Sequence, residues 1–461
     1  MSGIQYYSTN LKSGKVSFKE ALLKGQAPDK GLYMPEIIPQ LTKHELKDFT
    51  DKSYHEIAFA VINKFLNTEI PSNDLQAIVK DAYNFDVPFE NVYNRNYLMR
   101  LDQGPTASFK DFAARMMGRL MQYYLKKENH RLLILTATSG DTGSAIANAF
   151  FGLDNIKVVI LFPEKEVTDR QRKQMTTLHK NITVISLKGK FDDCQAMVKK
   201  AFADNDLNNL NLSSANSINI GRLLPQSVYY FWAYSKLANN TGEKIIFSVP
   251  SGNFGDLMGG IIAKHMGLPV KRFIISTNEN DEVPVYFSQG FYKIIKPSRN
   301  CISSAMNVGH PSNMARIIAL YGGQMDEIGL IHKNPDERRL RNDMYAVSIN
   351  DLETKATIKA VYEHHKILLE PHGAVGWAGL QRYFSDKKKE NKPDQLTVTL
   401  ETAHPAKFPE EIIKILGIDP ELPQSLVNLD KKEEDIIPME NDYNEFKQFL
   451  KGFSNPYNGR D

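Results

Sequence analysis

The sequence has few cysteines, no strong excess of charge of either sign and no long apolar run. Cys194 and Cys301 are its two cysteines among 461 residues, which excludes a disulfide framework, and no CxxC or Cys/His cluster indicates zinc. We interpret them as reduced thiols and expect no metal. With 57 basic and 54 acidic residues the net charge is only +3, so the electrostatics give no reason to expect nucleic acid or an anionic membrane as a partner.

The apolar segments are too short to direct the chain into a membrane. The N-terminal stretch MSGIQYYSTNLKSGK lacks the apolar core of a signal peptide. The longest apolar runs, Leu132–Leu135 and Val158–Phe162, fall far short of the ~20 residues that span a bilayer. The hydrophobic share of 42% and charged share of 24% are ordinary for a globular protein. We therefore expect a soluble, cytoplasmic protein.

Alternating strand and helix patterns predict an α/β fold. Helical patterns dominate the first ninety or so residues, for example over His44–Asn67 and Asp74–Asn84. From Tyr97 onward, short β-branched runs alternate with amphipathic stretches, which is typical of βαβ units and parallel sheets. The predicted strands are Tyr97–Leu101, Arg131–Thr136, Ile156–Phe162, Ile182–Leu187, Lys244–Val249, Arg272–Thr277 and Leu396–Leu400.

A polar segment divides the predicted α/β part. KLANNTGE, around Leu237–Glu243, separates a long apolar helix from the next strand. We therefore predict a mostly helical region over 1–95 and two α/β domains over 96–238 and 239–461. The tail after Pro423 is polar and expected to be peripheral, and the basic run Lys387–Lys392 is interpreted as a solvated loop.

A lysine stands at the start of a strongly periodic helix. Apolar residues recur at spacings of three and four from Phe109 to Tyr124, and Ser108 followed by Asp111 has the form of a capping box. Lys110 then lies in the first turn, where the helix dipole should lower the pKa of its amine. A lowered pKa suits an amine nucleophile or a Schiff-base former. Taken alone, a lysine in this position is more often a surface residue.

Two further strand-to-helix junctions are rich in glycine and hydroxyl residues. The segment ATSGDTG (Ala137–Gly143) could hold an anion, although Asp141 would repel one unless it faces a hydroxyl or an amine; a capped turn explains the segment equally well. In PSGNFGD, Gly252 and Gly255 let backbone N–H groups converge on a phosphate. Neither a Walker loop nor a dinucleotide fingerprint is present. One reactive amine and two anion cradles suit pyridoxal phosphate.

Several longer strings make the similarity specific. From GLYMPE (Gly31–Glu36) to TAHPAKF (Thr402–Phe408) the chain resembles threonine synthases of the bacterial and fungal form. The strings between these ends are SFKDFAARMMG, LTATSGDTGSAIANAFFG, LSSANSINIGRLLPQ, SVPSGNFGDLMGG, LPVKRFI and EPHGAVG. The resemblance implies a pyridoxal 5'-phosphate enzyme of fold type II, with two αβα domains like tryptophan synthase β and a mostly helical N-terminal region.

The resemblance also implies roles for individual residues. Lys110 matches the lysine that forms a Schiff base with the cofactor, and Thr402 matches the hydroxyl residue that faces the pyridine nitrogen. Asp141 lies near the cofactor ring hydroxyl, where many fold-type II relatives have asparagine. The loop that holds the cofactor phosphate is matched by Gly252, Asn253, Phe254, Gly255 and Asp256. Substrate binding is implied for Ser139, Gly140 and Thr142 at the amino-acid end and for Asn216, Ser217 and Arg222 at the phosphate.

The implied reaction converts O-phospho-L-homoserine and water into L-threonine and phosphate, by γ-elimination and β-hydration, as the last step of threonine biosynthesis. We expect a monomer or a homodimer. One alternative is a related phospho-lyase that releases 2-oxobutyrate and ammonia. A serine or threonine dehydratase is another, although it needs no site for a substrate phosphate. A non-catalytic relative of the same fold is the third.

Overall fold

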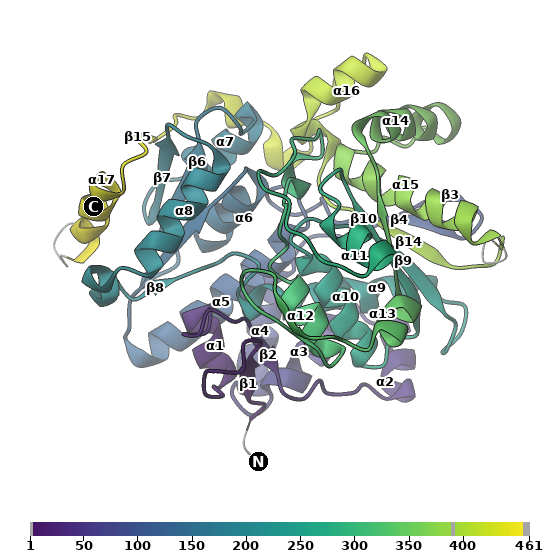
Figure 1. Cartoon of the computed structure of the whole chain (residues 1–461), viewed down its shortest axis with the longest axis horizontal. Coiled ribbons are helices and arrows are strands. Elements are labelled where there is room, and N and C mark those ends of the chain that lie inside the picture. The colour runs from purple at the N-terminus through teal and green to yellow at the C-terminus, as the bar shows by residue number, and fades with distance from the viewer. Residues whose placement is uncertain (1–2, 389–391, 455–461) are drawn as a thin grey trace.

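Two β-sheets of unequal size form the frame of the molecule (Figure 1). The computed structural model describes residues 3–388 and 392–454. The larger sheet is parallel except for the antiparallel pair at one edge. Its strands, in order across the sheet, are β13 (Met344–Ser348), β10 (Val270–Thr277), β9 (Ile245–Pro250), β14 (Thr397–Glu401), β4 (Asn96–Arg100) and β3 (Phe89–Tyr93).

The smaller sheet is parallel throughout. Its strands, in order, are β15 (Ile437–Met439), β7 (Ile182–Leu187), β6 (Ile156–Pro163), β5 (Leu132–Ala137) and β8 (Leu212–Ser213). Two short antiparallel pairs complete the strands: β1 (Tyr6–Ser8) with β2 (Tyr33–Pro35), and β11 (Gln324–Met325) with β12 (Ile331–Lys333).

Helices surround both sheets (Figure 1). In the first half of the chain they are α1 (Phe18–Lys24), α2 (Lys43–Asp48), α3 (Tyr54–Leu66), α4 (Ser72–Ala82), α5 (Lys110–Glu128), α6 (Asp141–Phe150), α7 (Asp169–Thr176), α8 (Phe191–Phe202) and α9 (Val228–Leu237). The second half contains α10 (Gly255–His265), α11 (Glu282–Gln289), α12 (Met314–Leu320), α13 (Glu337–Asp343), α14 (Asp351–His365), α15 (Pro371–Asp386), α16 (Pro409–Leu416) and α17 (Tyr443–Lys451).

Burial on both faces explains why these strands form parallel sheets. Every residue of β5 is buried, and successive side chains of a strand point to opposite faces. Leu133 and Leu135 pack in one core cluster with Met197 of α8, whereas Ile134 packs in another with Ile146 of α6. The larger sheet is covered in the same way by α10 and α15. The predicted architecture of two αβα domains is confirmed.

The predicted elements agree with the structure where the pattern was long. The seven predicted strands correspond to β4, β5, β6, β7, β9, β10 and β14, and their predicted ends agree with the structure to within two residues. The predicted helix His44–Asn67 is wrong in one respect, because it divides into α2 and α3. Ser53 starts a new helix in a capping box with Glu56, and Lys52 before it is extended.

The sheets combine strands from different predicted domain ranges. β4, from the range 96–238, pairs with β14 from the range 239–461, and β15 near the end of the chain pairs with β7. Figure 1 shows α17 beside the smaller sheet, together with this late segment. The predicted ranges did not anticipate either exchange, because partner choice between distant strands is set by packing and leaves no mark in the local sequence.

Two predictions fall partly on residues outside the described ranges. These are residues 389–391 of the basic run and residues 455–461 of the polar tail. The described part of the tail includes α17, whose Phe446 and Leu450 are buried in the core cluster of the smaller sheet. Within residues 3–388 and 392–454, no helix has the length and apolar character required to cross a membrane.

Candidate active site

Strands of both sheets end at one cavity of about 490 Å³. β5 leads there into α6, β9 into α10, and β14 into Thr402. Ligands of parallel α/β sheets bind at this end of the strands, and the volume is typical of a small-molecule site. All but one of the site residues predicted from the sequence line this cavity. They are Lys110, Ser139, Asp141, Thr142, Asn216, Ser217, Arg222, Gly252, Asn253, Phe254, Gly255, Asp256 and Thr402.

Gly140 is the predicted residue that does not line the cavity. Its φ of 128° is a conformation that favours glycine, and a Cβ atom there would lie 2.5 Å from the side chain of Gln171. The turn is fixed by Thr138, whose hydroxyl accepts hydrogen bonds from the N–H groups of Gly140 at 3.0 Å and Gly143 at 2.7 Å. Gly140 therefore shapes the loop, and its contact with a substrate stays a prediction.

Lys110 begins α5, but the predicted capping box is wrong. The Asp111 carboxylate accepts hydrogen bonds from the N–H and hydroxyl of Thr106, at 2.8 and 2.6 Å. The Ser108 hydroxyl is buried and has no hydrogen-bond partner in the described part of the chain. Thr106 offers the buried carboxylate two donors where a capping box would offer one, so the side chain turns back to the preceding loop.

Backbone hydrogen bonds hold this turn against the end of β14. The Phe109 N–H donates to the Thr402 carbonyl at 2.8 Å, and the His404 N–H donates to the Ala107 carbonyl at 3.0 Å. Lys110 and Thr402, although far apart in sequence, are therefore positioned by one short antiparallel contact. The two side chains lie on the wall of the same cavity.

Burial and neighbouring cations make the Lys110 amine easier to deprotonate. Burial lowers the pKa of Lys110 most strongly, and the charges of Lys407 and Arg222 lower it further, while Asp141 opposes them. The Asp141 carboxylate lies 3.8 Å from the Lys110 amine. The sequence predicted the direction of this shift from the helix dipole, whereas the main cause in the structure is burial.

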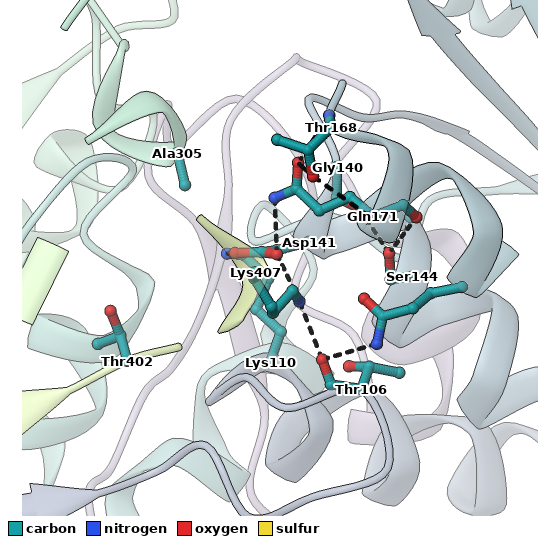
Figure 2. Close-up of polar contacts among 12 residues, drawn as sticks. Thr106, Lys110, Gly140, Asp141, Ser144, Thr168, Gln171, Ala305, Thr402 and Lys407 are labelled. Atoms are coloured by element: carbon teal, nitrogen blue, oxygen red, sulfur yellow. Dashed lines mark hydrogen bonds and ion pairs between the residues drawn. The ribbon is translucent and has the colours of Figure 1, made fainter. Parts of the chain in front are cut away.

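Asp141 faces amines, as the sequence required of a carboxylate in this loop. Its Oδ1 lies 2.6 Å from the Lys407 amine and accepts a hydrogen bond from Gln171 at 2.9 Å. Figure 2 shows Lys110 and Lys407 both directed toward Asp141. Burial alone would raise the pKa of Asp141, but the charges of Lys407 and Lys110 and the hydrogen bonds hold it well below its usual value. Asp141 is therefore ionised at neutral pH.

The GNFG turn presents backbone N–H groups to the cavity. Phe254 adopts a left-handed conformation with φ of 62° directly before α10, whose first N–H groups have no partner within the helix. A Cβ atom on Gly252 would lie 3.0 Å from the Ala305 carbonyl, so a side chain would crowd this wall of the cavity. A helix N-terminus reached through such a turn is a site for an anion.

Asp256 follows this turn and is buried. Burial raises the pKa of Asp256 to about 7, although the Leu257 N–H, which donates to its Oδ1 at 2.8 Å, and the charge of Lys110 both lower it. The folded state therefore binds this proton more tightly than the unfolded chain does. The free energy of unfolding therefore falls as the pH rises from the Asp256 pKa of the unfolded chain toward 7, and above 7 it falls no further for this reason.

Asp256→Asn is expected to remove this loss. At pH 8 the cofactor-free variant should be more stable than the unsubstituted protein by about 4 kcal/mol, and at pH 4 the two should unfold alike. Urea denaturation at the two pH values measures the difference. A stability gain of equal size at both pH values would show that the Asp256 carboxyl group is not the titrating group.

Arg222 brings an uncompensated positive charge to the cavity. Its Nη1 donates to the Ala215 carbonyl at 2.6 Å, its buried Nε has no hydrogen-bond partner, and it forms no ion pair within residues 3–388 and 392–454. Burial lowers the pKa of Arg222 to about 10, so the guanidinium remains charged at neutral pH. A buried cation without a partner is costly in the free protein and is available to an anionic ligand.

Asn216 and Ser217 lie beside Arg222 on the same wall. Their backbone is held by the fully buried Arg316, whose Nη1 donates to the Ser217 carbonyl at 3.1 Å. Thr136 at the end of β5 donates to the Asn216 side-chain carbonyl at 3.3 Å. This segment is therefore fixed in place before any ligand binds.

A chain of hydrogen bonds orients the Thr402 hydroxyl. The hydroxyl donates to Glu370 at 3.2 Å, and Glu370 also contacts Nδ1 of His372 at 2.5 Å. The Ala305 N–H donates to Nε2 of His372 at 3.0 Å. Because a backbone N–H can only donate, Nδ1 of His372 must hold the ring proton and donate it to Glu370. Thr402 therefore turns acceptor lone pairs toward the cavity.

The sequence analysis missed four residues of this site. They are Gln171, Lys407, Glu370 and His372. Lys407 lies within TAHPAKF, and Glu370 and His372 lie within EPHGAVG, so the strings that gave the resemblance already contained three of them. Glu370 and His372 contact each other, but the predicted site residues that these side chains meet, Asp141 and Thr402, are distant in sequence, and no local pattern assigned the four a role.

The residues of the cavity fit pyridoxal phosphate. Lys110 offers an amine of lowered pKa, the glycine turn offers N–H groups and Thr402 offers a hydroxyl. An amine, N–H donors and a hydroxyl are the groups that would suit the aldehyde, the phosphate and the ring nitrogen of this cofactor. With two αβα domains around the cleft, these groups define a pyridoxal-phosphate enzyme of fold type II.

Comparison with known families agrees: residues 89–402 match the family described as "Pyridoxal-phosphate dependent enzyme". Residues 5–83 match "Threonine synthase N terminus" and residues 373–450 match "Threonine synthase, C-terminal", and the chain belongs to the threonine synthase family.

Individual relatives match over the whole chain. The threonine synthase of Haemophilus influenzae is 38% identical, over 96% of this chain and 99% of the relative. The crystal structure of PLP-bound threonine synthase from Brucella melitensis has a TM-score of 0.90 at 34% identity, covering 98% of this chain and 100% of that one. Threonine synthase from yeast has a TM-score of 0.89 at 30% identity, covering 98% and 99%.

These comparisons confirm several predictions made from the sequence. The family, the fold type, the cofactor pyridoxal 5'-phosphate and the function of a threonine synthase, a lyase of threonine biosynthesis, are those predicted. The roles of the individual site residues stay predictions and are taken up next.

Proposed function

We propose that this chain converts O-phospho-L-homoserine and water into L-threonine and inorganic phosphate, with the site residues in the roles described below. The observation that supports this best is Arg222, a buried cation without an ion-pair partner in the same cavity as Lys110. The glycine turn provides one anion site and Arg222 provides a second. A reaction with a phosphorylated cofactor and a phosphorylated substrate needs both.

Lys110 holds the cofactor and moves protons during the reaction. When bound, pyridoxal phosphate supplies an electron sink for the substrate's α-carbon. The neutral Lys110 amine is the base that takes the proton from Cα. Once it has given that proton up, the same amine takes a proton from Cβ, which must leave before phosphate departs from Cγ. A lowered pKa is what such a base needs near neutral pH. Water then adds at Cβ to give the threonine hydroxyl.

The remaining residues bind and orient. Gly252, Asn253, Phe254, Gly255 and Asp256 hold the cofactor phosphate, and Thr402 faces the ring nitrogen. Asp141 lies near the ring hydroxyl, while Ser139, Gly140 and Thr142 receive the amino-acid end of the substrate. Arg222, with Asn216 and Ser217, binds the substrate phosphate, where a guanidinium can donate two parallel hydrogen bonds.

Substrate comparison tests this proposal against the alternatives. We expect phosphate release from O-phospho-L-homoserine, whereas L-serine and L-threonine should give little 2-oxobutyrate or pyruvate because they leave Arg222 unpaired. Faster turnover of L-serine or L-threonine would indicate a dehydratase, and 2-oxobutyrate from the phosphorylated substrate would indicate the eliminating phospho-lyase. A colourless protein that releases no phosphate would be a non-catalytic relative.

We also propose a cytoplasmic enzyme that acts as a monomer or homodimer. Both cysteines are buried and unpaired, which suits a reducing compartment. Light scattering on the purified, cofactor-loaded protein measures the mass; a trimer or larger assembly would contradict the proposed state.

A further inference from the structure

Lys407 is a second lysine in contact with Asp141, which lines the catalytic cavity, and nothing in the proposed mechanism uses it. It lies on the 3₁₀ helix η7 (Pro405–Lys407), directly after β14, and its side chain is fully buried. The amine contacts Asp141 at 2.6 Å and donates to the Thr106 carbonyl at 2.9 Å (Figure 2). A buried lysine is rare unless it is paired, so this position is strongly specified.

Two lysines therefore compete for one carboxylate. Asp141 is 2.6 Å from Lys407 but 3.8 Å from Lys110, so the closer and fully buried pair dominates. Gln171 occupies the same carboxylate oxygen from α7, at 2.9 Å. Lys110 faces the other oxygen, Oδ2, at the longer distance, and the charge of Lys407 disfavours its ammonium form against the opposing charge of Asp141.

We propose that Lys407 is a positioning residue for Lys110: by binding Asp141 it withholds the carboxylate from Lys110, so that Lys110 exists as a neutral amine able to bind the cofactor aldehyde. This also explains why the loop can contain an aspartate. An unpaired carboxylate at this position would repel the electron-rich ring hydroxyl of the cofactor, whereas a carboxylate paired with Lys407 does so less. Together, the ionised Asp141 and the Lys407 ammonium form a pair without net charge. The inference rests on the proposed function only for the identity of Lys110 as the cofactor lysine.

The other charged groups around the two lysines do not replace this pair. Arg222, which also lines the cavity, adds positive charge near Lys110, and Asp256 at the start of α10 adds an opposing carboxyl group whose own pKa burial raises. Asp111 and His404 lie near Lys407. The Asp111 carboxylate accepts hydrogen bonds from Thr106, and burial lowers the pKa of His404 to about 4. Neither Asp111 nor Asp256 forms an ion pair with a lysine in the described ranges.

Competitive acetylation of the cofactor-free protein, with mass spectrometry of the Lys110 peptide across a pH series, measures the titration of Lys110 directly. In Lys407→Met the midpoint should rise by at least one pH unit, because a positive charge is lost and Asp141 becomes free to pair with Lys110. In Asp141→Asn/Lys407→Met the midpoint should return to within about half a unit of the unsubstituted protein, since both charges are gone. Lys407→Arg, which keeps the charge, should leave it unchanged.

An unchanged midpoint in Lys407→Met would overturn the proposal, and so would a double variant that keeps the full shift. Lys264→Met is the matched control, because Lys264 is paired with Asp343 at 3.1 Å and lies outside the cavity. If Lys407→Met does not fold, Asp141→Asn is compared with Asp141→Asn/Lys407→Met; the double variant must then show the higher midpoint.

A second readout separates this inference from the proposed function. The pH midpoint of the absorbance of bound pyridoxal phosphate should move in the same direction in each variant. If borohydride treatment fails to attach the cofactor to Lys110, the proposed function is wrong, yet the acetylation series still tests Lys407. If the cofactor attaches but the acetylation midpoints do not respond, the inference about Lys407 alone is wrong.

Discussion

Lys110→Ala is expected to lower turnover of O-phospho-L-homoserine by ~10⁴-fold or more, because it removes both the amine that binds the cofactor aldehyde and the base that moves the protons. The variant should also lose the visible absorbance of the bound cofactor. Steady-state phosphate release and an absorbance spectrum of the purified protein check the two effects separately.

Lys127→Ala is the matched control for this change. Lys127 lies in the last turn of the same helix, α5, and is exposed, so its loss should alter neither turnover nor colour. If Lys110→Ala kept the turnover of the unsubstituted protein, the proposed role of Lys110 would be wrong, whatever the spectrum showed.

Arg222→Met is expected to lower kcat/KM for O-phospho-L-homoserine by about 10²- to 10³-fold, mostly through KM. Removing one partner of a buried charge-assisted pair costs about 2–5 kcal/mol, and here the substrate phosphate would enter a cavity wall without its cation. Initial rates over a range of substrate concentrations separate the two parameters.

Cofactor binding provides the internal control for Arg222. The GNFG turn, rather than Arg222, is proposed to hold the cofactor phosphate, so the absorbance and affinity of bound pyridoxal phosphate should change little. Arg222→Lys should recover part of the affinity for the substrate but not the bidentate geometry. A large loss of cofactor affinity in Arg222→Met, with unchanged KM, would contradict this assignment. It would indicate that Arg222 binds the cofactor phosphate and the GNFG turn binds the substrate phosphate.

The positions of the reactive groups could be predicted from the sequence because each lies at a strand-to-helix junction. Lys110 begins a periodic helix, and the SGDTG and GNFG segments follow buried strands, so local pattern places each of them at the carboxyl end of a strand, where ligands of parallel sheets bind. Thr402 required the resemblance, since a single hydroxyl residue after a strand carries no signal of its own.

The contacts that tune these groups could not be predicted in the same way. Asp141 meets Lys407, and Thr402 meets Glu370, through folding of segments that are distant in sequence. The predicted capping box at Ser108 failed for a local reason, because Asp111 accepts two hydrogen bonds from Thr106 in the preceding loop. The short strands β8 and β15 were missed for a related reason: two or three residues contain too little periodicity to be detected.

The most direct test of the proposed reaction is to incubate the cofactor-loaded protein with O-phospho-L-homoserine in H₂¹⁸O and to measure both products by mass spectrometry. We predict threonine and phosphate in a ratio of one to one, with one ¹⁸O in the threonine hydroxyl and none in the phosphate, because the Cγ–O bond breaks and water adds at Cβ. Label in the phosphate with homoserine as the other product, or 2-oxobutyrate in place of threonine, would contradict the account.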